Sequence, residues 1–403
     1  MFRYLRFFFG PALGVLTATM LFFGGIWLWV TPLAAIAVIV LLDQMFPYDL
    51  DEKPYRYDWI HDVALYLSTP VALYLFFALF WVAGSGDRDA LGYGAWLTSV
   101  TGIDVIAARN STAWYHYVLM FLAIAPAATG AGGLAGHELT HRTDRPFDLW
   151  LGRITMAFNW GIAFPIEHVY GHHAYVATMK DPATAARGDS IYQHLPKALK
   201  RTVVNAWEIE KGRLAKTGKP FLSPHNVLLR MMMVSIATTA FAFWCAGWTG
   251  VLFHVIVCFM TKFALENLNY IEHYGLLRLP TAPVQPRHSW NCNHTVSGVL
   301  TYNLTRHSHH HADAQIHYQD LRAHAEQPIM PGGFMGAYVS ALVPALWRKK
   351  IAPKLLEWDR TQADRSEYGL IRKANEASGW PELQQSVANT AGAAPATAGG
   401  LGY

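Results

Sequence analysis

The chain has 403 residues, of which 52% are hydrophobic and only 15% are charged. A soluble globular domain carries about 25% charged residues, so the composition favours a protein with membrane spans. Only 3 cysteines are present, which excludes a disulfide-built scaffold and a thiolate zinc cluster. The net charge is +4, but the basic residues are not interleaved with stacking aromatic residues, so no nucleic-acid partner is expected.

The apolar runs predict six membrane-spanning helices. Residues 7–42 carry no charge, and a run of 36 residues suits two helices joined at Gly24-Gly25. Further spans are expected at 62–84, 114–135, 231–248 and 250–270, with a loop over 85–113. Residues 149–165 are also apolar, but the run is short and contains Arg153, so it predicts a buried or interfacial helix.

These runs predict an all-α membrane protein: six transmembrane helices with a cytoplasmic, histidine-rich helical cap. Residues 1–135 hold spans one to four, and 226–272 hold spans five and six. Residues 136–225 and 273–387 form the two parts of the cap. The Ala/Gly/Thr-rich segment 388–403 is expected to be a disordered tail or a linker.

The basic residues predict the orientation. Six spans put both termini on one side, where twelve Lys or Arg lie between 136 and 225 and twelve more follow residue 275. The opposite side carries only Arg88 and Arg109. By the positive-inside rule, both termini and both large polar regions lie in the cytoplasm. The expected location is therefore the cell inner membrane.

The 19 histidines include four clusters, HELTH at 137–141, EHVYGHH at 167–173, NYIEHYG at 269–275 and RHSHHHA at 306–312. Spacings of three and four residues place the imidazoles of a cluster on one helix face, so each cluster is expected to converge on one point. Imidazole binds zinc, copper, iron and nickel, but one tetrahedral zinc uses four ligands at most. The four clusters offer nine imidazoles, more than one such site can use, and therefore predict two metals. The predicted ligands are His137, His141, His168, His172, His173, His273, His307, His310 and His311.

Metal-bound imidazoles usually donate their second N–H to a carboxylate or carbonyl. The carboxylates nearest to the clusters in sequence are Glu138, Glu167, Asp181, Glu272 and Asp313. Glu272 is alternatively a direct ligand. No catalytic side chain beyond the metal centre is expected. Lys262 and Glu266 stand four residues apart on span six and are expected to pair.

With these motifs, the chain resembles the membrane-bound alkane 1-monooxygenases, within the histidine-box fatty acid desaturase and hydroxylase group. The resemblance covers residues 40–350 and rests on HELTHR (137–142), EHVYGHH (167–173), NYIEHYGL (269–276) and LTRHSHHHA (304–312). DPAT (181–184) and HSWNCNH (288–294) add to it. The family's last motif usually reads LQRHSDHHA. Here Thr305 replaces Gln and His309 replaces Asp, which makes His309 a possible extra ligand. In the first motif, Arg142 stands where Lys is frequent.

The resemblance implies a non-haem centre of two iron ions that uses O₂ to hydroxylate the terminal methyl of linear alkanes to 1-alkanols. It implies electrons from rubredoxin, which a rubredoxin reductase reduces with NADH. Rubredoxin is acidic, so basic residues on the same face are candidates for its docking, namely Lys197, Lys200, Arg201 and Lys211.

Three other interpretations stay open. The first is a related di-iron desaturase or a xylene-type hydroxylase. The second is a membrane zinc metalloprotease that uses HELTH. The third is a metal transporter, which would place its ligands inside the spans.

Overall fold

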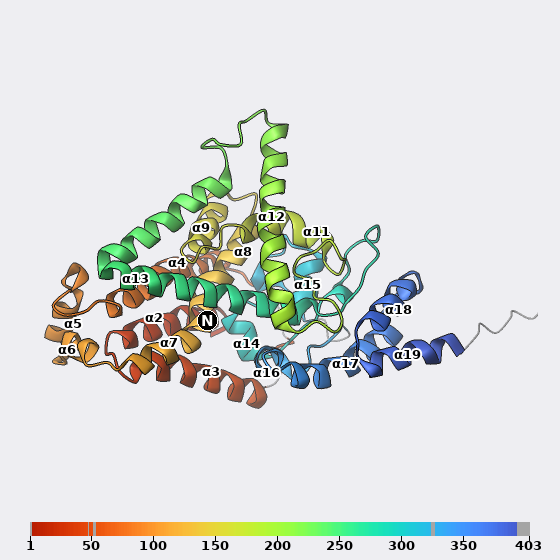
Figure 1. Cartoon of the computed structure of the whole chain (residues 1–403), viewed down its shortest axis with the longest axis horizontal. Coiled ribbons are helices and arrows are strands. Elements are labelled where there is room, and N and C mark those ends of the chain that lie inside the picture. The colour runs from red at the N-terminus through yellow and green to blue at the C-terminus, as the bar shows by residue number, and fades with distance from the viewer. Residues whose placement is uncertain (1, 47, 51–53, 324–326, 393–403) are drawn as a thin grey trace, which may run out of the picture.

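The computed structural model describes residues 2–46, 48–50, 54–323 and 327–392. Within them all regular structure is helical, and strand pairing is confined to two isolated bridges. The long apolar helices lie together at one end of the molecule, and the last helices of the chain extend from the other end (Figure 1). The all-α membrane architecture is confirmed. The segment 393–403, most of the predicted tail, lies outside the described residues.

The first long helix runs over α1 (Phe2–Leu5), η1 (Arg6–Phe8) and α2 (Phe9–Leu21), and the second is α3 (Trp27–Met45). They join at Gly24 and Gly25, whose φ angles are +64° and +51°. A Cβ on Gly24 would lie 2.6 Å from Oγ1 of Thr112, so both the backbone conformation and the contact require glycine. The predicted junction is confirmed.

The third long helix is α4 (Asp58–Val82), and the segment after it is not the loop that was predicted. It contains η2 (Ala90–Gly92), α5 (Tyr93–Thr101) and α6 (Val105–Asn110). The buried guanidinium of Arg109 donates to the carbonyls of Gly86 and Arg88 at 2.7 Å each. These bonds satisfy the backbone carbonyls where the segment folds back. Because they join residues about twenty positions apart, the local sequence did not reveal this fold.

The fourth long helix continues into the first histidine cluster. α7 (Trp114–Ala128) passes through the π-helical η3 (Thr129–Leu134) into α8 (Ala135–His141). α9 (Pro146–Ala157) packs against α8, and Gly136 and Gly152 allow the close approach because a Cβ on Gly152 would lie 2.8 Å from the Gly136 carbonyl oxygen. As predicted for the 149–165 run, α9 is not among the long apolar helices of the described chain.

The number of spans differs from the prediction. The described chain has five helices long and apolar enough to cross a membrane, so a count of six is not confirmed. The difference lies in α13 (Val227–His273), whose 47 residues would measure about 70 Å if straight. Ala246 and Gly247 leave helical geometry, and the two limbs of α13 diverge from this bend (Figure 1).

The remaining helices build the cap around the ends of the long helices. They are α10 (Phe164–Glu167), η4 (His168–His172), α11 (His173–Tyr175), α12 (Ile191–Lys216), η5 (Pro286–His288), α14 (Thr295–Leu300), α15 (His307–Ala312), η6 (Tyr318–Asp320), α16 (Gly333–Ala341), α17 (Pro344–Thr361), η7 (Arg365–Glu367), α18 (Tyr368–Ala377) and α19 (Pro381–Gly392). Buried aromatic residues such as Tyr274, Trp290, Trp347 and Trp358 form one core beneath this cap, and Phe76, Phe80 and Phe253 belong to a second core among the long helices.

Candidate metal centre

Four chain segments bring the nine predicted histidines together. α8 ends with the first cluster, η4 and α11 carry the second, His273 is the last residue of α13, and α15 carries the fourth. The nine side chains form two groups, in each of which one potential ligand atom per residue lies within 4.8 Å of all the others. Eight of the nine are buried, and His173 is half-buried.

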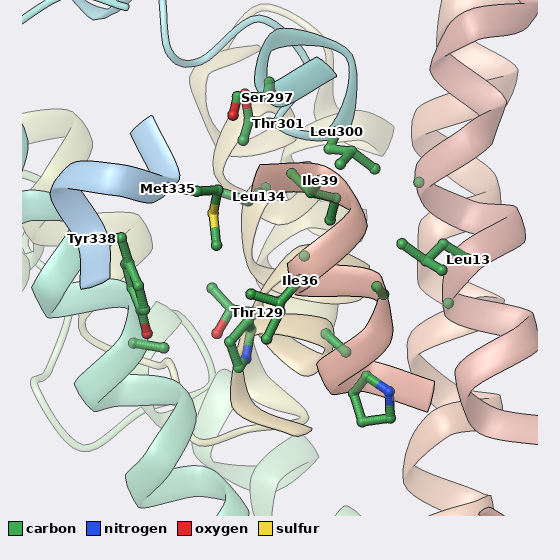
Figure 2. A pocket seen from close by; sticks show the side chains of 18 of the residues that line it. Leu13, Ile36, Ile39, Thr129, Leu134, Ser297, Leu300, Thr301, Met335 and Tyr338 are labelled. Atoms are coloured by element: carbon green, nitrogen blue, oxygen red, sulfur yellow. The ribbon is translucent and has the colours of Figure 1, made fainter. Parts of the chain in front are cut away.

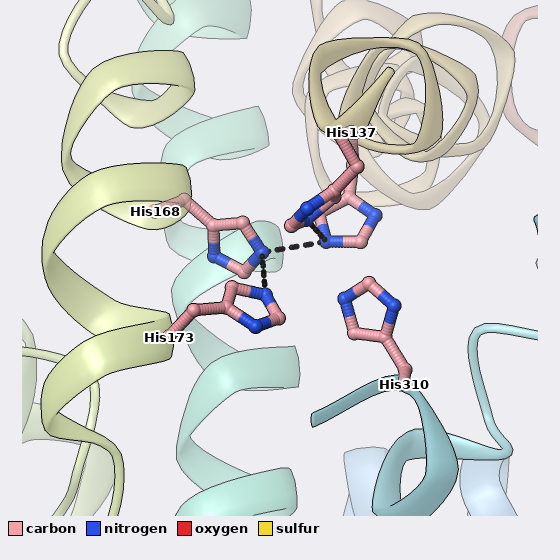
Figure 3. Close-up of side chains that lie close together, drawn as sticks. His137, His168, His173 and His310 are labelled. Carbon is pink, nitrogen blue, oxygen red and sulfur yellow. Dashed lines mark hydrogen bonds between the residues drawn. The ribbon is translucent and has the colours of Figure 1, made fainter. Parts of the chain in front are cut away.

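The five-histidine group contains His137, His141, His168, His173 and His310. The Nε2 atom of His168 lies 2.7 Å from Nε2 of His137 and 3.2 Å from Nε2 of His173. Figure 3 shows these rings, with the ring of His310, pointing toward a common centre.

The four-histidine group contains His172, His273, His307 and His311. Nε2 of His307 lies 2.9 Å from Nε2 of His273 and 3.0 Å from Nε2 of His311. Nε2 of His172 lies 3.2 Å from the same His311 atom. The rings of His173 and His311 stack with centroids 4.3 Å apart, so the two groups are adjacent.

The second and fourth clusters each divide between the groups, which corrects the expectation that each cluster converges on one point. His168 and His173 are five residues apart and share a group, whereas His172 belongs to the other. The cause is the π-helical geometry of η4, in which residues five apart occupy neighbouring positions. On α15, His307 and His311 share one group while His310 points into the other.

Burial keeps most of these imidazoles neutral. It lowers the pKa of His168, His173, His307 and His311 well below the usual value, and neighbouring imidazoles add to the effect. The pKa of His310 falls to about 3 for the same reason. A neutral imidazole has the free lone pair that a metal ligand needs.

His172 behaves differently because it contacts Asp181. Burial opposes a charge on its ring, but the negative charge of Asp181 and a hydrogen bond of 2.9 Å from Nδ1 outweigh it and raise the pKa. Asp181 is itself held by the hydroxyl of Thr184 and the backbone N–H of Ala183. The bond assigns the ring proton to Nδ1 and leaves the lone pair of Nε2 pointing into the four-histidine group.

The other predicted carboxylates lie in different surroundings. Glu272 has one oxygen 3.5 Å from Nε2 of His307, and its Oε1 is buried with no hydrogen-bond partner among the described residues. Glu138 accepts from Arg142, and Glu167 accepts from Asn205 at 3.3 Å. Burial, together with nearby Asp181, raises the pKa of Glu167 to about 7. Asp313 is exposed and accepts from the backbone N–H of Gln315.

The donor set fits metal ions. Ring nitrogens within each group lie only 2.7–3.3 Å apart, and this convergence of several imidazole nitrogens on one point is the arrangement that a shared cation needs. Nε2 of His310 is buried without a hydrogen-bond partner in the described part of the chain, as expected of an atom that binds a metal ion. Five imidazoles exceed the four ligands of a tetrahedral zinc site, whereas iron accepts imidazole at higher coordination numbers.

The structure places the other candidate residues outside the two groups. His309 accepts a hydrogen bond from the backbone N–H of Arg322 at its Nδ1. His194 pairs with Glu266 at 3.2 Å, so the predicted pairing of Glu266 with Lys262 is replaced by this contact. The four basic docking candidates lie on α12, which packs against α10 and η4.

Sequence reasoning gave little weight to Arg142, which the structure makes central to the first cluster. Its side chain is 1% exposed and forms ion pairs with Asp62, Glu138 and Asp148. These contacts join the end of α8 to α4 and α9. The only sequence signal was a cation at the end of an apolar span, where an unpaired charge is costly.

Comparison with known proteins agrees with this geometry. The fatty acid desaturase family model matches residues 112–338, which include all nine histidines. An alkane 1-monooxygenase of Pseudomonas putida is 32% identical over 334 residues, 80% of this chain and 76% of that protein. Alkane 1-monooxygenase 2 of Alcanivorax borkumensis is 40% identical over 55% of this chain and 59% of its own length.

A third relative is the hydroxylase component of the xylene/toluene monooxygenase of Pseudomonas putida. It is 27% identical over 94% of this chain and 96% of its own length. The identity to the alkane 1-monooxygenases is higher, and the matched region contains every segment that builds the two histidine groups. The chain therefore belongs to the fatty acid desaturase family, and within it to the alkane 1-monooxygenases.

Proposed function

We propose that this chain is an integral-membrane, non-haem di-iron monooxygenase that hydroxylates the terminal methyl group of linear alkanes. The observation that carries the proposal is the division of nine imidazoles into adjacent groups of five and four. The relationship to alkane 1-monooxygenases supplies the substrate class. In the balanced reaction, an alkane, O₂, two electrons and two protons give a 1-alkanol and water.

In this proposal each histidine group holds one iron ion, and the bound irons supply O₂ activation and oxygen transfer to a C–H bond. The chain contributes the neutral imidazoles, and Asp181 fixes the ring of His172. Nearly complete burial of both groups keeps bulk water from the reacting atoms.

An apolar cavity supports an alkane as the substrate. It has a volume of about 130 Å³ and is bounded by α2, α3, α7, η3, α13, α14 and α16. Figure 2 shows Leu13, Ile36 and Ile39 on one side and Met335 and Tyr338 on the other. Gly10 and Gly14 both line it, and a Cβ on Gly10 would meet only the Leu300 carbonyl oxygen at 3.8 Å.

A second, much smaller space lies between the cavity and the histidines. This space has a volume of about 10 Å³ and is lined by His137, His168 and His307. Leu134 and Leu268 line both spaces and therefore separate them. A chain in the large cavity has to pass these two leucines to bring its end to the histidine groups.

We further propose that rubredoxin, reduced by its reductase with NADH, delivers the electrons at α12. Lys200 is exposed, Lys197 pairs with Asp189 at 2.8 Å, and Arg201 donates to two backbone carbonyls. This basic helix packs on η4, so a donor bound here is one helix away from the second histidine cluster. Changing Lys200 to Glu is expected to raise the KM for rubredoxin and to leave iron content unchanged.

The proposed location is the inner membrane, with both termini and the histidine groups in the cytoplasm. The native cysteines, Cys245, Cys258 and Cys292, are all buried, so an introduced cysteine reports its own side. In intact cells, a membrane-impermeant maleimide should label Ser99→Cys on α5 and spare Lys200→Cys on α12. The reverse labelling pattern would refute this orientation.

The reaction itself is tested by supplying purified protein with NADH, rubredoxin, its reductase and linear alkanes of several lengths. The expected products are 1-alkanols, and one oxygen of the product should come from ¹⁸O₂. A parallel arm with xylene and a fatty acyl substrate tests the alternative hydroxylase and desaturase activities. If 1-alkanol is absent at every chain length, the proposal fails.

Metal analysis separates the proposal from a zinc metalloprotease that uses HELTH. The two histidine groups predict about two irons per chain, whereas a protease of that kind needs one zinc. One zinc with no iron in active protein would favour the protease.

A further inference from the structure

A groove outside the two histidine groups opens between the limbs of α13. It has a volume of about 800 Å³ and is lined by both limbs, by Trp160 and Ile162 after α9, and by Val203 of α12. Figure 1 shows the limbs separating from the bend, with α12 near their open end. None of the nine histidines lines this space.

The two ends of the groove differ in polarity. Near the bend its lining residues are Phe243, Trp248 and Val251, and their side chains are apolar. Lys262 lies fifteen residues beyond Gly247, about 22 Å along the helix and toward the open end. The contact between Thr239 and His254, at 3.1 Å, fixes the limbs against each other between these ends. The groove is therefore apolar at the bend and polar at its open end, which suits a ligand with an apolar chain and one polar head.

Lys262 carries the charge at the polar end. Its Nζ donates to the carbonyl oxygen of Trp160 at 2.7 Å. Among the described residues no carboxylate lies within 4.0 Å of its Nζ; Glu266 attracts it from a longer distance and is itself paired with His194. A cation on a membrane-spanning segment is costly without an anionic partner, so the remaining N–H groups of Lys262 favour an anion from outside the chain.

The apolar wall faces the surroundings of the protein. Ile236 is 56% exposed and Trp248 is 78% exposed, and both line the groove on a helix long and apolar enough to cross a membrane. In a bilayer these side chains meet acyl chains rather than water. Basic pockets between membrane helices are known to bind anionic headgroups.

We propose that this groove binds an anionic phospholipid of the bilayer. The headgroup phosphate accepts hydrogen bonds from Lys262, and one acyl chain lies along the limbs toward Phe243 and Trp248. The site rests on the membrane location of α13 and is independent of the reaction at the histidine groups, so its test does not depend on hydroxylase activity.

The test is native mass spectrometry of the delipidated full-length protein after dioleoyl phosphatidylglycerol or dioleoyl phosphatidylcholine is added back. The wild type is expected to prefer phosphatidylglycerol by about fivefold, the effect of one lysine on an anionic lipid. Lys262→Met, which keeps the length of the side chain and removes the charge, should bind both lipids equally. Lys373→Met removes an exposed lysine on α18, away from the groove, and should keep the preference.

A second pair of variants tests the apolar part without changing the charge. Ala240 lines the groove and Ala237, one turn earlier on the same limb, does not, and both are exposed. Ala240→Trp should weaken binding of both lipids, and Ala237→Trp should bind like the wild type. Equal lipid preference in the wild type, an unchanged preference in Lys262→Met, or unchanged binding in Ala240→Trp would each overturn the proposal. Displacement of phosphatidylglycerol by equimolar oleate would overturn it too, because the ligand would then be a free carboxylate.

Discussion

At the scale of single residues, the surroundings separate the proposed ligand histidines from the others. His273 and His194 are both buried, yet His273 faces three imidazoles while His194 faces the carboxylate of Glu266. An imidazole among imidazoles is stable when a cation shares their lone pairs, whereas one beside a carboxylate is satisfied without a metal. Contacts therefore assign the role more directly than burial does.

The first prediction concerns His273. Replacing it with alanine leaves three imidazoles in the four-histidine group, and we expect iron to fall from about two to about one per chain with loss of hydroxylation. Iron is measured by plasma mass spectrometry on purified protein. His309→Ala is the matched control and should keep both irons, because His309 lies outside both groups. Loss of iron in His309→Ala would show that His309 is an extra ligand.

The second prediction concerns Asp181. In Asp181→Asn the ring of His172 loses its anionic acceptor, and we expect iron affinity or activity to fall about 10- to 100-fold. Chelator competition measures the affinity. Asp313→Asn changes another carboxylate near a cluster, but Asp313 is exposed and makes its contact with Gln315. It should bind iron like the wild type, and equal losses in the two variants would contradict the role of Asp181.

At the scale of elements, two departures from regular helix geometry position the site and the spans. The π-helical η4 sends His172 away from the group that holds His168 and His173. The break at Ala246 and Gly247 turns α13 back on itself, and a Cβ on Gly250 would clash with the backbone of Ala242 at the bend. Both are local geometries that depend on tertiary packing for their stability.

The third prediction concerns the connection between α8, α4 and α9. Arg142→Met leaves the buried carboxylate of Glu138 without its cation and Asp148 with only the more distant Arg145, and the expected loss is about 3–5 kcal/mol in the free energy of unfolding. Thermal unfolding in detergent measures it as a lower Tm. Arg145→Met removes a half-exposed guanidinium that pairs with Asp62 and, at 3.8 Å, with Asp148, and should cost about 0–1 kcal/mol. Similar losses would show that burial of the Arg142 network is unimportant.

At the scale of the whole molecule, the apolar cavity exists only because elements distant in sequence surround it. α2 and α3 come from the first part of the chain, while α14 and α16 come from the last. The small residues on its wall leave open volume, since a Cβ on Gly130 would meet nothing within 4 Å. The close packing of Gly136 against Met156 shows that other glycines of the same helix do serve helix contact.

The fourth prediction uses the open volume beside Gly130. Gly130→Leu places a side chain in the cavity, and we expect turnover of long alkanes to fall about tenfold or more while the shortest substrates are still oxidised. Gas chromatography across a series of chain lengths provides the measurement. Gly212→Leu on α12 is a control for adding leucine at an open helical glycine, and its length profile should not change. An unchanged profile in Gly130→Leu would argue against this cavity as the substrate site.

The sequence by itself determined the features that depend on local pattern. Long uncharged runs predicted the apolar helices, because a bilayer demands consecutive apolar residues. Four short histidine clusters, three of them with helical spacings and one with His273 alone, identified the same nine histidines that the structure gathers.

Only the tertiary structure decided how those residues are shared. The division into groups of five and four depends on a π-helical turn and on α15 supplying histidines to both groups, and neither follows from spacing. The buried partners of Arg142, the true contact of Glu266, and the cavity between the first and last helices are likewise long-range. Their common cause is that the energy of a buried charge or an open volume is set by what packs against it, which lies far away in the sequence.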